Sequence, residues 1–322
     1  MSTPTTDESP EITELWENAR AKEPEVTSSD DSFHPPVTDD PLWTETAWFS
    51  FDVPERGLVG WVYPFFRPNL GLSAAIIHVW DDTGHSVDET LYSSCQWYLP
   101  MPDQDLTDLR MANGIQYRTL EPLHRYAVEY RDADFALDFQ FEGVHAPRYF
   151  GADGQGHFDQ MGHVTGSLCL GDKEITIDCL AMRDRSWSVR HDVGPVRVSY
   201  DVIAAAPDHL LHTTGVGSQE KILGGYLLRD GVTGRITSGT REVERQGSRP
   251  MSARIVAADE FGREVTATGK AVNGLGALMT PRYFVWASLF DWSLDGVPAW
   301  GEDQEGWSLD QLRAARASGD YR

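Results

Sequence analysis

From Thr46 onward, apolar and polar residues alternate in short runs that are separated by turn residues. Turn sequences such as DDTG, DGQG and LGDK punctuate runs at 57–66, 72–81, 136–144, 163–170 and 174–182. Alternation with a period of two, in short segments rich in Val, Ile, Tyr, Phe and Trp, is typical of half-buried β-strands. The pattern therefore predicts an all-β protein with few short helices.

A second set of strand patterns fills the last third of the chain. It comprises 222–231, 235–245, 252–272 and 282–296. Two comparable sets, one before and one after about residue 190, exceed what one small barrel encloses. We predict two β-barrels packed side by side, an N-terminal one over 31–192 and a C-terminal one, ending in a helix, over 193–322.

The first residues of the chain differ from this pattern. Residues 1–45 hold twelve acidic and two basic residues. A segment with so much charge of one sign buries too little apolar surface to fold by itself. We expect residues 1–30 to form a flexible acidic tail.

Charge and cysteine content narrow the class of protein. The net charge of −23 argues against a nucleic-acid partner. The three cysteines lack paired spacing, which argues against a disulfide framework and favours a cytoplasmic location. The chain contains no run of about 18 consecutive apolar residues, so we expect no membrane insertion. The chain also lacks GxSxG, P-loop, GxGxxG and HExxH sequences, so we expect no cofactor.

The densest group of polar residues follows the apolar run EITIDCLAM, in the sequence RDRSW. On a continuing strand, Arg183, Arg185 and Trp187 point to one side of the sheet. The intervening Asp184 and Ser186 point to the other side. Polar groups beside a tryptophan are typical of a cleft that binds a small molecule. The structural alternative is a buried Asp–Arg pair that joins the two barrels.

Three groups that can bind a metal or carry a proton lie in the sequence GHFDQMGH, namely His157, Asp159 and His163. On an extended strand the two histidines are about 20 Å apart, because each residue advances the chain by about 3.3 Å. One metal ion therefore reaches both only if the chain turns at Gly162. We predict no metal site, and instead a hydrogen-bonding network that orients Asp184.

The quoted segments, extended to GHVTGSLCLGDKEITIDCLAMRDRSWSVR, resemble the tandem lipocalin-like superfamily of carotenoid 1,2-hydratases, AttH-like proteins, kievitone hydratase and fungal Diels–Alderases. WTETAWFSFDVPERGLVGWVYPFFRPNLG (43–71) and WGEDQEGW (300–307) carry the same resemblance, which covers most of 31–310. It implies two lipocalin-like barrels. The family commonly shows a tyrosine and then Asp-His-Asn-Trp-Gly at this place, where this chain has Met182 for the tyrosine and Arg185 for a histidine.

The resemblance also implies roles for single residues. Asp184 matches the acid of the hydratases, His157 a histidine one hairpin upstream, and Trp187 the family tryptophan. With Asp184 and His157, Arg185 completes the predicted catalytic set. An arginine lowers the pKa of a neighbouring carboxyl group, which favours an ionised Asp184 unless burial outweighs it. The predicted substrate-binding residues are Trp187, Arg183, Asp159, Gln160, Trp97, Trp286 and Glu302.

Glu302 lies in WGEDQEGW, which the sequence favours as an acidic turn held by its tryptophans; the alternative is a second carboxylate at the barrel junction. The functional hypothesis is a lyase or isomerase that hydrates, dehydrates or isomerises an apolar molecule of terpenoid or steroid size. A non-catalytic lipid or isoprenoid carrier and a pocket that shapes a pericyclic reaction are the alternatives. The expected partner is a hydrophobic small molecule. The sequence makes no prediction of oligomeric state.

Overall fold

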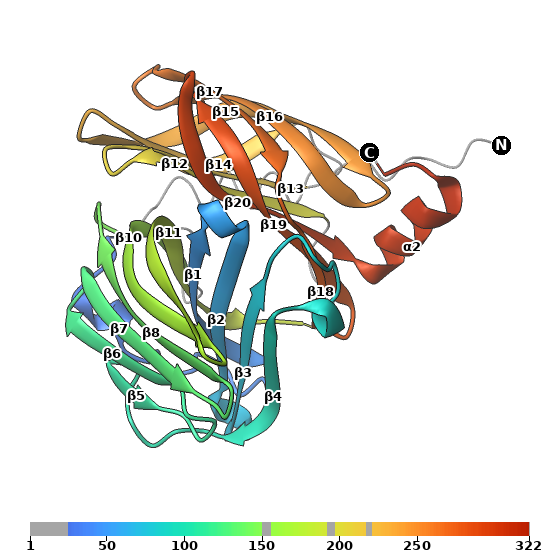
Figure 1. Ribbon diagram of the computed structural model, residues 1–322. Coiled ribbons are helices and arrows are strands. Elements are labelled where there is room, and N and C mark those ends of the chain that lie inside the picture. The colour runs from blue at the N-terminus through green and yellow to red at the C-terminus, as the bar shows by residue number, and fades with distance from the viewer. Residues whose placement is uncertain (1–24, 150–155, 192–196, 217–220, 322) are drawn as a thin grey trace.

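The computed structural model describes residues 25–149, 156–191, 197–216 and 221–321, and its described part contains two antiparallel sheets (Figure 1). The first sheet has the strand order β4-β3-β2-β1-β11-β10-β8-β7-β6-β5, with β9 paired to β10. Its strands are β1 (Trp43–Val53), β2 (Leu58–Arg67), β3 (Leu72–Trp80), β4 (Tyr92–Pro100), β5 (Asp108–Arg110), β6 (Gln116–Glu121), β7 (Arg125–Arg131), β8 (Phe135–Gly143), β9 (Arg148–Tyr149), β10 (Gly156–Leu170) and β11 (Lys173–Val189).

The second sheet has the order β17-β16-β15-β14-β13-β12-β20-β19-β18. Because β17 also pairs with β19, eight of its strands close into a barrel, whereas the first sheet curls into an open half-barrel. Its strands are β12 (Val198–Ala206), β13 (His209–Val216), β14 (Ile222–Arg229), β15 (Val232–Gln246), β16 (Arg249–Asp259), β17 (Glu264–Ala271), β18 (Leu275–Thr280), β19 (Tyr283–Leu294) and β20 (Val297–Ser308).

Helices are short in the described part of the chain. Among the described residues, four single-turn 3₁₀ helices lie before or between the first strands. They are η1 (Ser28–Asp31), η2 (Pro54–Arg56), η3 (Pro68–Leu70) and η4 (Val87–Glu89). The α-helix α2 (Leu309–Ser318) follows β20 directly, and the hydroxyl of Ser308 caps it by accepting the backbone N–H of Gln311. No helix among the described residues is long and apolar enough to cross a membrane.

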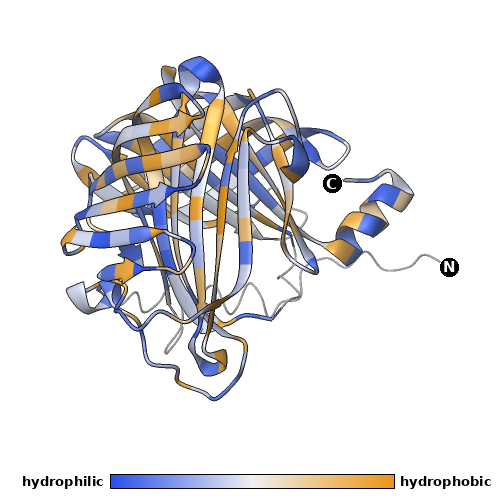
Figure 2. Cartoon of the chain, turned by 60° about the horizontal axis from the view of Figure 1, so that its bottom comes forward, coloured by the Kyte–Doolittle hydropathy of each residue, from blue (hydrophilic) through white to orange (hydrophobic). Residues whose placement is uncertain are grey.

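The alternating sequence pattern becomes alternating burial. Along β8, Phe135, Leu137, Phe139 and Phe141 are buried in the core of the first sheet and the residues between them are more exposed. Figure 2 shows the same alternation of hydrophilic and hydrophobic residues along the strands. The predicted all-β fold with two barrel units is therefore confirmed, with the first unit an open half-barrel and the second a closed barrel.

Strand β1 departs from this alternation, because all of its residues are buried. One face packs into the core of the first sheet, while the other meets the second sheet. We call this contact region the junction. It is an apolar layer in which Trp48, Trp61 and Met182 of the first sheet pack with Tyr226 and Leu289 of the second.

The chain passes from the first sheet to the second between Val189 and Val198, around residues that lie outside the described part. The proposed domain boundaries at 30 and 192 stay predictions. Most of the predicted acidic tail, residues 1–24, also lies outside the described residues. At its end, Val26 is buried against Trp43 and Phe158, and Thr27 caps η1.

Candidate active site at the junction

Strand β11 sorts the sequence RDRSW onto two faces of the first sheet. Arg183, Arg185 and Trp187 point into the half-barrel, and Asp184 and Ser186 point toward the second sheet. This division follows from the strand period of two, as the sequence predicted. The two faces have different partners, so each is described in turn.

The inward face is a set of buried ion pairs and stacked rings. The guanidinium of Arg183 lies 3.5 Å from Asp31 and donates to the side chain of Gln160 at 2.8 Å. The guanidinium of Arg185 lies 3.0 Å from Glu45. These buried ion pairs link β11 to η1, which contains Asp31, and to the start of β1, which contains Glu45.

The predicted roles of these inward residues depended on their lying beside Asp184. The structure instead places Arg183, Arg185 and Gln160 on the opposite face of the sheet from the Asp184 carboxyl group. Trp187 also lies on that face, stacked on His34 with ring centroids 3.7 Å apart. The buried Asp–Arg interpretation therefore describes this face, although the pairs lie within the N-terminal half and do not join the barrels.

The outward face brings together three of the predicted site residues. Asp159 on β10 is the direct neighbour of Asp184 on β11 in the strand register. The Nε2 atom of His157 lies 2.7 Å from Oδ1 of Asp159 and 4.0 Å from Oδ2 of Asp184. His163, farther along the same strand, pairs instead with Asp178 at 2.6 Å. The structure thus juxtaposes His157, Asp159 and Asp184, and separates His163 from them.

The second sheet completes this cluster with two residues that the sequence analysis missed. The hydroxyl of Tyr200 on β12 donates to Oδ1 of Asp159 at 2.6 Å. The Nε2 atom of His212 on β13 lies 3.4 Å from Oδ2 of Asp159. Both residues are more than 40 positions from Asp159, and no local pattern links them to it. Only the packing of the two sheets reveals this contact.

Burial and charge give the acidic groups different pKa values. Burial alone raises the pKa of Asp159, but His157 and His212 together outweigh burial and the net pKa is lowered, so Asp159 is ionised. Burial lowers the pKa of His157, but Asp159 outweighs it and the net pKa is raised. The pKa of Asp184 is raised to about 6 by burial, which outweighs the lowering by His157 and by nearby arginines.

Asp184 is therefore an acid that changes protonation near neutral pH. Its Oδ1 atom is buried and has no hydrogen-bond partner in the described part of the chain. Next to it, Arg190 donates a short hydrogen bond to the hydroxyl of Ser186 and a longer one, 3.5 Å, to the hydroxyl of Tyr63. This arrangement leaves one buried carboxyl oxygen of Asp184 without a hydrogen-bond partner among the described residues.

The same three groups also have the composition of a metal site. One ligand atom from each of His157, Asp159 and Asp184 fits within 4.8 Å of the others. A bound cation would replace the 2.7 Å contact between His157 and Asp159 and would draw Asp184 closer, because metal–ligand bonds to N and O are about 2.0–2.2 Å. The absence of a metal stays a prediction.

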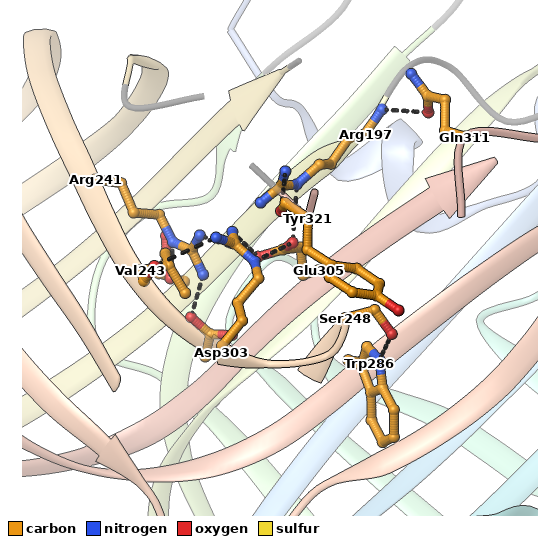
Figure 3. Close-up of polar contacts among 11 residues, drawn as sticks. Arg197, Arg241, Val243, Ser248, Trp286, Asp303, Glu305, Gln311 and Tyr321 are labelled. Atoms are coloured by element: carbon orange, nitrogen blue, oxygen red, sulfur yellow. Dashed lines mark hydrogen bonds and ion pairs between the residues drawn. The ribbon is translucent and has the colours of Figure 1, made fainter. Parts of the chain in front are cut away.

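The remaining predicted residues are spread over the molecule. Trp97 on β4 is 47% exposed. Trp286 lies in the second barrel, where its indole N–H donates to Ser248 at 2.9 Å (Figure 3). Glu302 is buried at the junction and accepts the indole N–H of Trp61 at 2.7 Å. It is part of strand β20, so the preferred interpretation of this segment as an acidic turn was wrong.

Comparisons with known structures place the fold. An AttH-like protein from Nitrosomonas europaea matches with a TM-score of 0.53 at 16% identity, over 83% of this chain and 92% of that one. CghA with Sch210972 matches with a TM-score of 0.58 at 12% identity, over 84% and 89%. Kievitone hydratase from Nectria haematococca matches with a TM-score of 0.54 at 11% identity, over 88% and 92%.

These matches confirm the fold of the tandem lipocalin-like superfamily that the sequence resembled. No curated protein matches the sequence significantly. A family profile described as a domain of unknown function, DUF7064, matches residues 27–302. This range includes the half-barrel, the Asp184 cluster and most of the second barrel. The chain belongs to the DUF7064 family.

Proposed function

We propose that this protein is a cofactor-independent hydratase, dehydratase or isomerase that acts on an apolar small molecule at the junction. The observation that carries the proposal is the state of Asp184, a largely buried carboxyl group with a pKa of about 6 and one buried oxygen that has no hydrogen-bond partner among the described residues. A general acid is most effective when its pKa lies near the working pH. Asp184 meets this condition through its surroundings alone.

One carboxyl group suffices for the proton transfers of such a reaction. In a dehydration, protonated Asp184 gives its proton to a substrate hydroxyl group, which leaves as water. The resulting carboxylate then takes a proton from the carbon next to the cation, and a double bond forms. Hydration is the reverse, and an isomerisation protonates one carbon and deprotonates another.

His157 and Asp159 support this cycle by electrostatics. The carboxylate of Asp159 raises the pKa of His157 and so favours its protonated form, whose Nε2 atom lies 4.0 Å from Asp184. A positive charge at this distance stabilises Asp184 after it has given up its proton. Tyr200 holds Asp159 in place from the second sheet. The two sheets must therefore be docked for the acid to have its working environment.

Aromatic rings beside Asp184 support a reaction that passes through a cationic intermediate. Trp48 is the register neighbour of Asp184 on β1, so its side chain lies on the same face of the sheet. Its ring centroid lies 6.1 Å from that of Tyr200 and 5.8 Å from that of Trp61. Aromatic faces stabilise nearby cations. We assign this role to Trp48, whereas Trp187, which the sequence predicted to bind substrate, lies on the other face of the sheet.

The substrate class follows from the surroundings. Residues beside the cluster, including Met161 and Met182, belong to the apolar junction, which favours a hydrophobic molecule of terpenoid or steroid size with a tertiary or allylic alcohol or an alkene. Among proteins of this fold, one is named a hydratase and another was crystallised with the small molecule Sch210972. These names support the proposal by analogy of fold.

The test is Asp184→Asn, which preserves shape but removes the proton. Wild-type protein is screened for turnover of a panel of terpenoid alcohols and alkenes. For the substrate found, the variant should lose about 10²–10⁴-fold in kcat while the Kd changes within a few-fold. The matched control is Glu174→Gln, which removes an exposed carboxylate from the same strand and should leave kcat unchanged.

The pH profile gives a second readout. For dehydration, kcat/KM should fall as pH rises through about 6, because Asp184 must be protonated to donate. Full activity of Asp184→Asn would overturn the assignment of this residue. Tight ligand binding with no turnover across the panel would favour a carrier, and turnover that survives Asp184→Asn would favour a pocket that shapes a pericyclic reaction.

A further inference from the structure

A second acidic site lies at the other end of the junction from Asp184. An open cleft of about 760 Å³ runs between the two sheets there. Its walls include Val144 and Leu180 from the first sheet and Ala204, Pro207 and Trp300 from the second. Strand geometry separates this cleft from the Asp184 cluster, because Asp52, which lines it, is four residues along β1 from Trp48, the neighbour of Asp184. This corresponds to about 13 Å.

The charges around the cleft have one sign. Asp52, Glu142, Asp178 and Asp208 line it, and no lysine or arginine is among the described lining residues. His163 is the single lining side chain that can become cationic, and it is 2.6 Å from Asp178. Such a cleft disfavours anionic ligands and favours a cation.

Asp52 distinguishes this cleft from an ordinary acidic surface, because it is a buried acid that lines the cleft. It is only 3% exposed, yet it lines the cleft. Within the described residues, no hydrogen bond or ion pair joins its carboxyl group to another side chain. An unpaired buried carboxylate is costly, so this group gains most from a cation that enters from the cleft.

The groups around Asp52 offer no such cation. The negative charge of Glu55 on η2 disfavours ionisation of the Asp52 carboxyl group. The backbone N–H of Asp52 donates to the thiol of Cys179 on β11. Glu302 on β20 lies behind it and is held by Trp61. Burial, reinforced by Glu55, raises the pKa of Asp52 to about 7, and burial raises that of Glu302 to about 8. At neutral pH Glu302 therefore keeps its proton, and Asp52 is the group that a ligand cation would ionise.

We propose that this cleft is a second small-molecule site, which binds an apolar amine with its ammonium group at Asp52 and its hydrocarbon part along Trp300 and Leu180. The indole ring of Trp300 contributes both apolar surface and attraction for the cation. The Asp184 reaction is not needed for this binding. The site adds a ligand class, organic cations, that the catalytic proposal does not include.

The test compares octylamine with 1-octanol, which share the hydrocarbon chain and differ in charge. Isothermal titration calorimetry of the full chain at pH 8 should show octylamine binding at least about tenfold more tightly. Asp52→Asn should remove this preference while octanol binding stays within about twofold. Asp138→Asn, which removes an exposed carboxylate of β8 outside the cleft, is the matched control and should leave both affinities unchanged.

The wild-type protein alone supplies an independent test. Because the ammonium group requires ionised Asp52, octylamine affinity should fall by about tenfold for each pH unit below about 7, whereas octanol affinity should not. Asp184→Asn should leave octylamine binding within twofold, which separates this site from the proposed catalytic one. Equal affinity of the two probes, or an equal loss in Asp52→Asn and Asp138→Asn, would overturn the proposal.

Discussion

Buried carboxylates inside the two sheets have arginine partners, whereas those at the junction do not. In the half-barrel, Asp31 faces Arg183 and Glu45 faces Arg185. At the junction, Asp184, Asp52 and Glu302 have no ion pair with an arginine among the described residues. The first kind face arginines of opposite charge, whereas the three junction acids lack them and burial raises their pKa values. Asp303 in the closed barrel combines both features, because burial and its acidic neighbours raise its pKa to about 8 although Arg241 lowers it.

The closed barrel shows the matched kind most fully (Figure 3). The guanidinium of Arg241 contacts Asp201 at 3.0 Å, Glu305 at 3.3 Å and Asp303 through a short ion pair. Arg245 and Arg197 each reach Glu305 at 2.8 Å. Three arginines thus meet three acids inside one barrel. The comparison teaches that charge matching separates acids that support the fold from acids that are available for chemistry and ligands.

The largest effect on stability is expected from Arg241→Met, which removes the central arginine of the matched acids. The substitution leaves Asp201, Asp303 and Glu305 with less positive charge in a buried space, so the free energy of unfolding should fall by about 3–5 kcal/mol at pH 8. The loss should shrink toward pH 5, where Asp303, whose pKa burial raises to about 8, is protonated. Urea unfolding measures both values. A loss below about 1 kcal/mol at pH 8 would show that the network contributes little to stability.

A smaller effect of opposite sign is expected from Glu302→Gln. The pKa of Glu302 is raised from 4.5 to about 8, so its protonated form stabilises the fold at low pH, and this stabilisation is lost as pH rises through about 8. The variant should be more stable than wild type at pH 8.5, by roughly 1–3 kcal/mol, and similar to it at pH 5.

Urea unfolding midpoints at both pH values check this expectation. The control is Glu264→Gln, an exposed glutamate at the start of β17, whose stability should follow that of wild type at both pH values. If Glu302→Gln were less stable than wild type at pH 8.5, Glu302 would belong with the matched acids and the comparison would fail at this residue.

The smallest effect on stability is expected from an exposed ion pair, which serves as the reference for the Arg241→Met and Glu302→Gln predictions. Arg118 and Glu129 form an ion pair of 2.8 Å on the solvent side of the first sheet, where Arg118 is 44% exposed. Solvent screens such pairs, so Arg118→Ala should change the unfolding free energy by less than about 1 kcal/mol. Thermal unfolding in low and high salt measures this. An effect as large as that of Arg241→Met would mean that burial does not govern these pairs.

The sequence predicted the fold more completely than the site. Alternating runs such as 136–144 identified strands, because side-chain direction along a strand is a local property. The same alternation divided RDRSW correctly into two sets. It did not show which set faces the junction, and so Arg185 was placed with Asp184. The choice depended on Glu45, which is 140 residues away from Arg185 and accepts its hydrogen bond.

The Asp52 cleft is a second feature that the local sequence pattern could not predict. Asp52 stands in the ordinary segment FSFDVPERG, and nothing around it in the sequence indicates a buried, unpaired carboxyl group. Its environment arises because Trp300 and Glu302, about 250 residues later, come from the second sheet. Tyr200 and His212 were missed for the same reason.

The sequence by itself determined the strands, the two-barrel architecture and the face of the strand to which each side chain points. These properties follow from the local backbone period and from the amount of apolar surface to be buried. Only the tertiary structure decided which acids meet arginines and which remain without them. That distinction depends on contacts between residues 40 to 152 positions apart, and burial without an arginine partner raises the pKa values of Asp184 and Asp52.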